Sequence, residues 1–570
     1  MNLNDVGKII KRILFVSTIL LLSCLVIYEL RESVTESDEG DELFSVIYTA
    51  ESKQQIKGFY SEEILYFCVP GYMEFQDVKL KIRESYQLVI GDLVFENGDS
   101  LLQIKTDQLY DVSYGRKGKD KKSFQVIFMQ GSHLPIVRVN TTSGNLDYIH
   151  SQKGNSESGF MQVYDADGKL LSITDVKSMK GRGNTAWDAI KKSYTLHLDD
   201  AADILGMGSD KVWVLNANWY DGAYIRNQIG FEVAKSAGIE NTPEACFVEL
   251  YVNDEYMGLY QIMEKIKTGK NRIDIRDDYL LEIDFRFRVG EEENHIMLSN
   301  EQPIIIHSPE KNVDVEGVQC FFDEFSSRME QGDIPLDLID LESFAKMFVM
   351  EDFLQDMDFG YSSHYMILGL EEGILSEGPV WDMDNTLGRG IATQAKPLFV
   401  TNYDLNYNNL SRWCARLYSN EMFRSQVFYE YQENFRPALI ELINGGVTER
   451  INAIQASVKM DLRRFPETRS NFMSDASLEE NVEYLTDYLR AKIKIMDECY
   501  VDGTGSTVND IELPLLERQA SDFEINTDID QEEEPMGIVS VVMQYKMLVM
   551  LLVMLIFYMI LYYRYRKARK

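Results

Sequence analysis

The chain has 570 residues, a hydrophobic share of 45% and a formal net charge of −35. That length is too great for one compact core, so two or three folded units are expected, and the hydrophobic share excludes a wholly disordered chain. The acidic excess argues against binding to DNA or RNA, since a phosphate-binding surface needs clustered basic residues. An acidic chain that handles phosphate would have to recruit a divalent cation.

Two apolar segments, 9–28 and 547–563, have the composition of transmembrane helices. Basic residues lie at the outer end of each, around Lys8 in the first and in RYRKARK after the second. The positive-inside rule then predicts a two-pass protein of the cell membrane, with both termini in the cytoplasm and the main part extracytoplasmic. A cleaved or lipidated first segment, ending at Cys24, is the alternative. No small-x-small site follows it, and the apolar run continues past the cysteine.

Residues 41–130 contain short alternating segments such as SVIYTA, EEILYFCV and SFQVIFM, separated by Gly, Asp and Lys turns. This pattern predicts a small β-sandwich-like domain with no catalytic constellation. The cysteines show no CxxC spacing and imply no disulfide framework, and the six histidines show no zinc-ligand spacing. Residues 503–540 are rich in Gly, Ser, Thr, Asp and Glu, which is typical of an acidic linker to the second span.

Residues 133–500 read as one mixed α and β domain. GFMQVYDADGKLLSI predicts a hairpin with its turn at 165–168, because the further ligands of a calcium loop are missing. The Gly-rich break MKGRGNTAW follows, then the alternating strand KKSYTLHL, then a helix over 221–238. ACFVELYV and YMGLYQIM flank Asn253-Asp254 and predict a second hairpin.

The second half of this domain is expected to be more helical. Helical apolar periods run through VEGVQCFFDEFSSRMEQG, LESFAKMFVMEDFLQ, 405–445 and 476–498. Between them, SSHYMILG and ILSEGPVW predict a strand pair whose return strand ends at Asp382. The whole chain is therefore expected to be α+β.

The stretch GPVWDMDNTLGR, residues 378–389, carries the strongest chemical signal. Asp382 and Asp384 stand at i and i+2, and on an extended segment both side chains would point to one side. Two carboxylates so placed repel each other unless a cation joins them. Mg²⁺ favours one or two carboxylates together with phosphate oxygens, so we expect a magnesium ion that carries nucleotide phosphates.

The order of these parts is that of protein kinases: a Gly-rich loop, a lysine on a strand, a helix, a hairpin and a helical lobe with two Asp sites. Over roughly residues 133–500 the sequence resembles the spore coat protein H (CotH) kinases. The stretches that carry the resemblance are KGRGNTAW with KKSYTLHLD, LNANWYDGAYIRNQIGFEVA, VELYVNDEYMGLYQIMEKI, YLLEIDFRF and GPVWDMDNTLG. The resemblance implies an atypical two-lobed protein-kinase-like domain, preceded by the β-sandwich and flanked by the two spans.

The resemblance also implies roles for single residues. Lys192 would bind phosphate, Asp382 would be the principal Mg²⁺ ligand with Asp384 assisting, and Asp358 would be the catalytic base. The nucleotide would be bound by the Gly-rich loop, the helix motif and the inter-lobe acidic residue, which are Gly181, Arg182, Gly183, Asn184, Arg226 with Asn227, and Glu264. The cofactors would be ATP and Mg²⁺ or Mn²⁺, and the partner a surface or coat protein phosphorylated on Ser or Thr.

Several alternatives stay open at this point. Lys191 could replace Lys192, and Asp356 could replace Asp358 as the base. Ser363 stands where a protein kinase has the Asn that holds a second metal, so a second ion would need Asn385 or Asp384. The domain could also be an inactive surface-binding protein with a kinase-like fold.

The stretch DMDNTL suggests a third possible function, because it looks like the nucleophile motif of haloacid dehalogenase-type phosphatases. There Asp382 would attack the phosphoryl group and Asp384 would act as acid and base. That fold places the motif after a strand of a doubly wound sheet, with alternating β and α units to follow. The helices expected after Thr386 do not fit that context.

Overall fold

The computed structural model describes residues 44–48, 53–119, 121–275, 278–285, 289–290, 294–298, 301–389, 394–403, 408–466 and 476–501. All of them belong to the first of two compact units, Met1–Leu516. The apolar segments 9–28 and 547–563 and the linker 503–540 lie outside the described residues. No described helix is long and apolar enough to cross a membrane. Both spans therefore stay predictions.

Two sheets formed by residues 44–130 share one hydrophobic core. The first has the order β2-β1-β5 and the second the order β3-β4-β9-β8-β6-β7. Alternating sequences such as VKLKI in β5 bury every second side chain, and Val78, Phe67 and Phe128 lie in the common core. The strands are β1 (Phe44–Tyr48), β2 (Gln54–Ile56), β3 (Phe59–Ser61), β4 (Ile64–Val69), β5 (Val78–Ile82), β6 (Tyr86–Ile90), β7 (Leu93–Phe95), β8 (Leu109–Arg116) and β9 (Lys122–Gln130).

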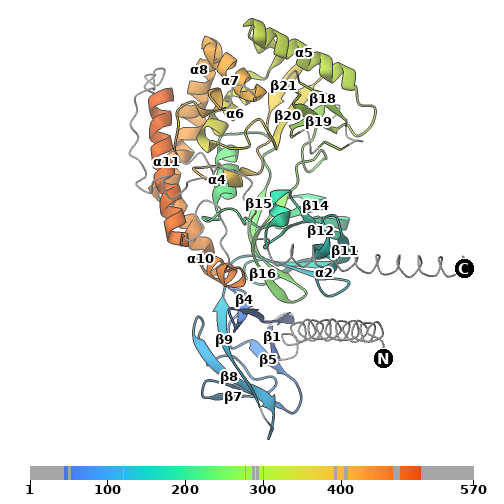
Figure 1. Cartoon of the computed structure of the whole chain (residues 1–570), viewed down its shortest axis with the longest axis vertical. Coiled ribbons are helices and arrows are strands. Elements are labelled where there is room, and N and C mark those ends of the chain that lie inside the picture. The colour runs from blue at the N-terminus through green and yellow to red at the C-terminus, as the bar shows by residue number, and fades with distance from the viewer. Residues whose placement is uncertain are drawn as a thin grey trace, which may run out of the picture. The chain divides into compact units, whose positions relative to one another are not determined.

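A closed seven-stranded barrel follows, with the order β10-β11-β12-β13-β14-β16-β15. It closes through a parallel pairing in which Ile136 of β10 lies opposite Glu249 of β15. Its strands, drawn in green in Figure 1, are β10 (Ile136–Thr141), β11 (Ser156–Tyr164), β12 (Leu170–Arg182), β13 (Ser193–Asp203), β14 (Ser209–Asn216), β15 (Ala245–Val252) and β16 (Glu255–Glu264). Three helices lie between them: α2 (Asp147–Ser151), α3 (Thr185–Asp188) and α4 (Arg226–Ser236).

Both predicted hairpins of the barrel are confirmed. The Gly168 N–H donates to the Asp165 carbonyl at 3.0 Å, which closes the turn between β11 and β12. At the turn between β15 and β16, Asn253 and Asp254 have φ values of 53° and 72°. Two consecutive left-handed residues are what a two-residue hairpin turn requires, and Asn and Asp tolerate that conformation.

A five-stranded sheet has the order β18-β19-β17-β20-β21. The predicted strand pair is present as β20 and β21, but β21 ends at Glu377, so the prediction that Asp382 ends this strand is wrong. Pro379 has no N–H for a sheet ladder, and Gly378 has a φ of 99°, so the chain leaves the sheet here. The strands are β17 (Tyr279–Ile283), β18 (His295–Met297), β19 (Pro303–Ser308), β20 (His364–Gly369) and β21 (Ile374–Glu377).

Helix α5 shows how capping residues bound a helix of the second half. In α5 the Asp314 side chain accepts the N–H of Gly317, the apolar residues Val318, Phe321 and Phe325 are buried, and Gly332 follows with a φ of 79°. The helices are α5 (Val315–Gln331), α6 (Leu341–Leu354), α7 (Asn409–Ser419), α8 (Glu421–Glu430), α9 (Arg436–Glu441), α10 (Val447–Arg464) and α11 (Leu478–Tyr500). Short turns of 3₁₀ or π type are η2 (Leu336–Leu338), η3 (Met383–Asn385), η4 (Phe399–Thr401), η5 (Tyr431–Phe435) and η6 (Leu442–Gly446).

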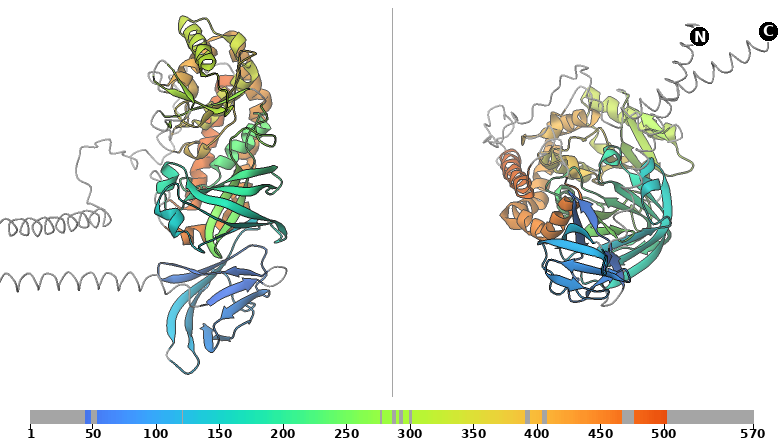
Figure 2. Two further views of the ribbon diagram at one scale, coloured as in Figure 1. Left: turned by 90° about the vertical axis from the view of Figure 1, so that its right-hand side faces the viewer. Right: turned by 60° about the horizontal axis from the view of Figure 1, so that its bottom comes forward.

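The barrel and the helical part are joined by packing as well as by chain connections. Helix α10 contacts β16 of the barrel, and α11 contacts α6 and α9. In Figure 1 α10 lies at the barrel and α11 runs beside the other helices, and Figure 2 shows the same two helices, in orange and red, from two further sides. The described part of the chain is thus α+β, as predicted.

Candidate active site

A cavity of about 390 Å³ lies where the barrel meets the loops around β20 and β21. The described lining residues include five carboxylates and two arginines, and no lysine. They are Arg182, Gly183, Asn184, Thr185, Ala186, Ser193, Asn216, Tyr220, Asn227, Met263, Glu282, Asp284, Asp358, Ser362, Ser363, Tyr365, Trp381, Asp382, Asp384, Asn385 and Arg389. A cavity with this charge balance requires a cation before it can accept an anionic ligand.

The structure brings together most of the predicted site residues. Segments far apart in the sequence contribute Arg182, Gly183 and Asn184, then Asp358, then Asp382 and Asp384. Four predicted residues do not line the cavity, and each of them supports a neighbouring element instead; these are Gly181, Lys192, Arg226 and Glu264.

The Gly-rich stretch spans the end of β12 and the turn after it, and its two glycines, Gly181 and Gly183, serve different purposes. Gly183 has a φ of 85°, a conformation that strains any residue with a Cβ. At Gly181 a Cβ would lie 1.9 Å from the ring of Trp187. Gly181 therefore makes room for Trp187, and Gly183 makes the turn that borders the cavity.

The two adjacent lysines precede β13 and are both engaged elsewhere. Lys191 is fully buried and forms an ion pair of 2.9 Å with Asp461 of α10. Lys192 donates to the main-chain carbonyls of Trp187, at 2.6 Å, and of Ala189, at 3.2 Å. Its Nζ also lies over the Trp187 ring, 4.5 Å from the centroid. This geometry does not support the prediction that Lys192 contacts phosphate.

Asp382 and Asp384 both line the cavity, but not from an extended segment. Asp382 has φ and ψ of 58° and 47°, and the single turn η3 follows it. The prediction of an extended segment is therefore wrong, although the two side chains still meet in one place. Burial raises the pKa of Asp384 to about 7, and the negative charge of Asp382 adds to this shift. A left-handed Asp at a functional loop is strained, and the surrounding contacts must hold it.

Helix α4 holds the loop of residues 382–389, which we call the aspartate loop. The Met383 N–H donates to Oδ1 of Asn227 at 2.9 Å, and Nε of Arg226 donates to the Thr386 carbonyl at 3.0 Å. Arg226 is itself fixed by an ion pair of 2.5 Å with Asp221. A Cβ on Gly230 would lie 2.3 Å from Sδ of Met383, so this glycine allows the close approach. Arg226 thus positions the loop and does not reach the cavity.

The loop after α6 separates the two candidate bases. Asp358 lines the cavity, whereas Asp356 is buried behind it and accepts the N–H of Asp358 at 2.9 Å. Burial raises the pKa of Asp356 well above its usual range, and the charges of Glu351 and Asp358 add to this. Asp356 is therefore placed to brace the loop, and Asp358 is the carboxylate that can meet a substrate.

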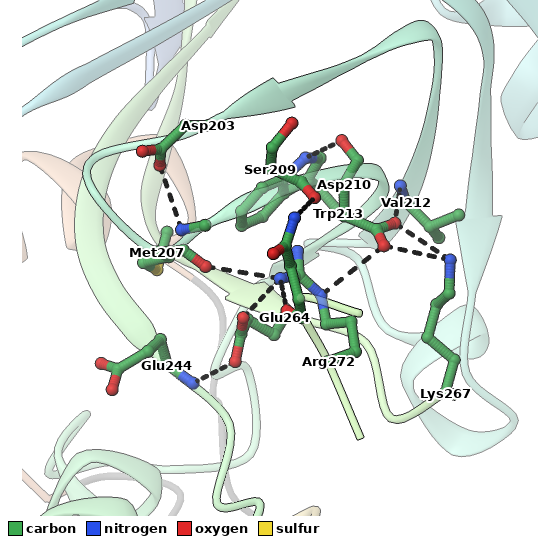
Figure 3. A network of polar contacts seen from close by, with 12 residues as sticks. Asp203, Met207, Ser209, Asp210, Val212, Trp213, Glu244, Glu264, Lys267 and Arg272 are labelled. Carbon is green, nitrogen blue, oxygen red and sulfur yellow. Dashed lines mark hydrogen bonds and ion pairs between the residues drawn. The ribbon is translucent and has the colours of Figure 1, made fainter. Parts of the chain in front are cut away.

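Glu264 belongs to a polar network on the barrel, which Figure 3 shows from close by. Its Oε1 lies 2.5 Å from Nη1 of Arg272, and its Oε2 accepts the N–H of Glu244 at 2.9 Å. Arg272 also stacks over the ring of Trp213, and Lys267 pairs with Asp210 at 3.1 Å. Burial raises the pKa of Glu264. Glu264 thus anchors the segment after β16 and does not line the cavity.

A family model described as CotH kinase protein matches residues 179–496, more than half of the 570 residues. The chain belongs to the CotH kinase family. The predicted family is thereby confirmed. No curated protein matches the chain.

The phosphatase alternative does not fit the surroundings of the CotH aspartate loop. The described strand pairings of the five-stranded sheet are all antiparallel, including β20 with β21 just before the loop. A haloacid dehalogenase fold needs the motif directly after a parallel strand of a doubly wound sheet. Here the motif follows an antiparallel strand and an irregular segment, and helices come after it.

Several cavity residues of this CotH protein were not predicted from the sequence. Glu282 and Asp284 stand within YLLEIDFRF, a stretch that carried the family resemblance without being given a role. Arg389 ends the stretch GPVWDMDNTLGR. Ser193 and Asn216 come from paired strands β13 and β14, and Ser193 Oγ donates to the Asn216 side chain at 3.3 Å. These polar residues gave no spacing signal, because only the folded packing of separate elements brings them together.

The donor set fits a magnesium ion that is shared with a nucleotide. Within the described residues no three His, Cys, Asp or Glu side chains form a complete metal cage. Mg²⁺ does not need one, since it keeps waters and phosphate oxygens beside one or two carboxylates. Asp382 and Asp384 supply such a pair, and Asp382 is exposed to solvent at the cavity.

Proposed function

We propose that this CotH family protein is a membrane-anchored kinase that transfers the γ-phosphate of ATP to Ser or Thr of a surface or coat protein. The proposal depends on one observation: the Gly183 turn, Asp358 and the Asp382–Asp384 pair line the same cavity. Phosphoryl transfer needs a surface for the phosphates, carboxylates for the metal and a carboxylate near the acceptor hydroxyl. All three are present within one volume.

Each residue then has a defined task. Asp382 and Asp384 would hold Mg²⁺ or Mn²⁺, and the ion, when bound, offsets the negative charge of the phosphates. Asp358 would accept a hydrogen bond from the acceptor hydroxyl and take its proton during transfer. The polypeptide at Gly183 offers a side-chain-free border on which phosphates can approach the main chain.

The inactive alternative has one observation in its favour, which is the absence of a lysine among the described cavity residues. Transfer of label decides between the two. The purified chain is incubated with γ-labelled ATP, Mg²⁺ and a Ser-rich acceptor protein. Acid-stable label on the acceptor, or on the chain's own Ser and Thr, supports the kinase. Nucleotide binding without any transfer under Mg²⁺ or Mn²⁺ supports the inactive binding protein.

The membrane part of the proposal depends on the apolar segments 9–28 and 547–563 and their basic flanks. It predicts that residues near 520 lie outside the cell. A single cysteine engineered there should react with an impermeant reagent in intact cells. Reaction only after lysis would place the main domain in the cytoplasm and would refute the two-pass topology.

A further inference from the structure

The cavity needs more positive charge than one divalent ion provides. Five carboxylates line it, and a nucleoside triphosphate would bring several further negative charges. The lysine that the family resemblance suggests is bound to the carbonyls of Trp187 and Ala189. The described lining residues contain two permanent cations, Arg182 and Arg389.

Arg182 reaches the aspartate loop from the barrel. It is the last residue of β12, and its guanidinium lies over the ring of Trp381, 5.5 Å from the centroid. Trp381 directly precedes Asp382. Burial lowers the pKa of Arg182, whereas the charge of Asp382 opposes that shift, which indicates that the two charges are close. A guanidinium in this place lies beside both the Gly-rich turn and the metal-binding carboxylates.

The second cavity arginine, Arg389, comes from the end of the aspartate loop. Its Nη1 donates to the Asp384 carbonyl at 3.2 Å and to Oδ1 of Asn385 at 3.4 Å, and its guanidinium lies over the Tyr220 ring at 5.4 Å. Its Nε is buried and has no partner in the described part of the chain. One edge of the guanidinium is thus fixed by the loop, and a further donor stays unused.

We propose that Arg389 and Arg182 both bind the phosphate groups of the nucleotide, in the role that a lysine has in protein kinases. This inference rests on the proposed function. A planar guanidinium can form two parallel hydrogen bonds to a phosphate and stays charged when it is partly buried. Lys192 is then a positioning residue: it holds the carbonyl groups at the end of α3, and α3 follows the turn of Gly183.

A binding series separates phosphate contact from simple support of the loop. Affinities of the full-length chain for adenosine, AMP, ADP and ATP are measured with Mg²⁺ by calorimetry. In the wild type, affinity should rise with each phosphate. Arg389→Ala should lower ATP affinity by about 10- to 100-fold, the range expected for lost charged hydrogen bonds. Adenosine affinity should stay unchanged, because adenosine has no phosphate. Arg182→Ala should show the same pattern.

Lys192→Ala should change the affinities for adenosine and ATP by the same factor, since a positioning residue acts on the whole site. Arg416→Ala, an exposed arginine on α7, is the matched control and should leave the series as in the wild type. If Arg389→Ala unfolds, Arg389→Lys and Arg389→Gln replace it. Lys keeps the charge and should retain part of the ATP preference, whereas Gln should lose it.

Two results would overturn the assignment. The first is a full phosphate preference in both folded arginine variants. The second is a preference that disappears in Lys192→Ala while adenosine binding persists, which would return the role to the lysine. If the wild type binds nucleotides and either of these results is found, only the roles of the two arginines are contradicted, and the proposed function is not. If the wild type binds no nucleotide at all, the proposed function fails, and the arginine assignment fails with it.

Discussion

Nζ of Lys191 lies 2.9 Å from Oδ1 of Asp461, and both side chains are fully buried. Lys192, the next residue, instead holds two carbonyl groups beside the Gly-rich turn. The two lysines lie in the bend just before β13, and their side chains enter different surroundings. One lysine joins the barrel to α10, and the other supports the cavity border.

This difference predicts unequal losses of stability. Lys191→Met leaves Asp461 as a buried unpaired charge, which should cost about 3–5 kcal/mol of unfolding free energy. Lys192→Met removes hydrogen bonds at a half-buried site and should cost about 1 kcal/mol. Urea denaturation of both variants measures the difference. The double variant Lys191→Met/Asp461→Leu should recover part of the loss, because neither charge remains. Equal stability of Lys191→Met and the wild type would contradict the burial of this pair.

Asp382→Asn should abolish Mg²⁺-dependent nucleotide binding. The substitution is nearly isosteric but removes a charge that the cation needs, and it also relieves repulsion with Asp384. The melting temperature in the absence of metal should therefore be unchanged or slightly higher. Thermal shifts with ATP, with and without Mg²⁺, test this prediction. A normal Mg²⁺-dependent shift in the variant would make Asp384 the main ligand.

Asp358→Asn should abolish phosphoryl transfer and leave nucleotide binding intact, because this carboxylate would face the acceptor hydroxyl. Asp356→Asn is the matched control. Burial raises the pKa of Asp356 well above its usual range, so the neutral amide resembles the protonated acid and should retain transfer. Label transfer and calorimetry are measured on both variants. Lost transfer in Asp356→Asn alone would reverse the two roles.

The buried carboxyl group of Glu249 should make the unfolding free energy depend on pH. Burial raises its pKa to about 8, whereas an unfolded Glu titrates near 4.3. The folded state then holds a proton that the unfolded state releases, so unfolding free energy should fall as pH rises from about 4.3 to about 8. Glu249→Gln cannot lose that proton and should be more stable than the wild type above pH 8, by several kcal/mol. Urea denaturation at several pH values measures this.

Glu330→Gln, an exposed residue of α5, serves as the control for this pH series and should follow the wild type. The profile of unfolding free energy against pH for Glu249→Gln is subtracted from that of the wild type. If the difference does not fall between pH 5 and pH 8, Glu249 is ionised in the folded protein and the prediction is wrong.

Local patterns were sufficient to predict the hairpin at Asn253-Asp254 and the helix α5, because turn chemistry and apolar spacing act over few residues. The order of motifs also predicted the family and placed Asp358 and Asp382 together. The roles of Lys192 and Glu264 could not be decided in this way. Their partners are the Trp187 carbonyl and Arg272, and which atoms a long side chain reaches depends on the folded packing.

The meeting of Arg389 with barrel residues at the cavity could not be anticipated either. Ser193, Asn216 and Arg389 meet at the cavity only because β13, β14 and the aspartate loop converge there. Each is a common polar residue in its own segment, with no periodic partner. Their contribution is a property of long-range topology, which a single sequence does not display.

The parallel pairing of β10 with β15 has a consequence for the order of folding. During synthesis β10 to β14 are complete before β15 and β16 are made, so both edge strands of this sheet, β10 and β14, have no partner in the meantime. The ion pair between Lys191 and Asp461 forms later still, because α10 is made after all the barrel strands. Chains released before β15 and β16 have been made should therefore hold an open, aggregation-prone sheet, and the barrel should close only when this hairpin is available.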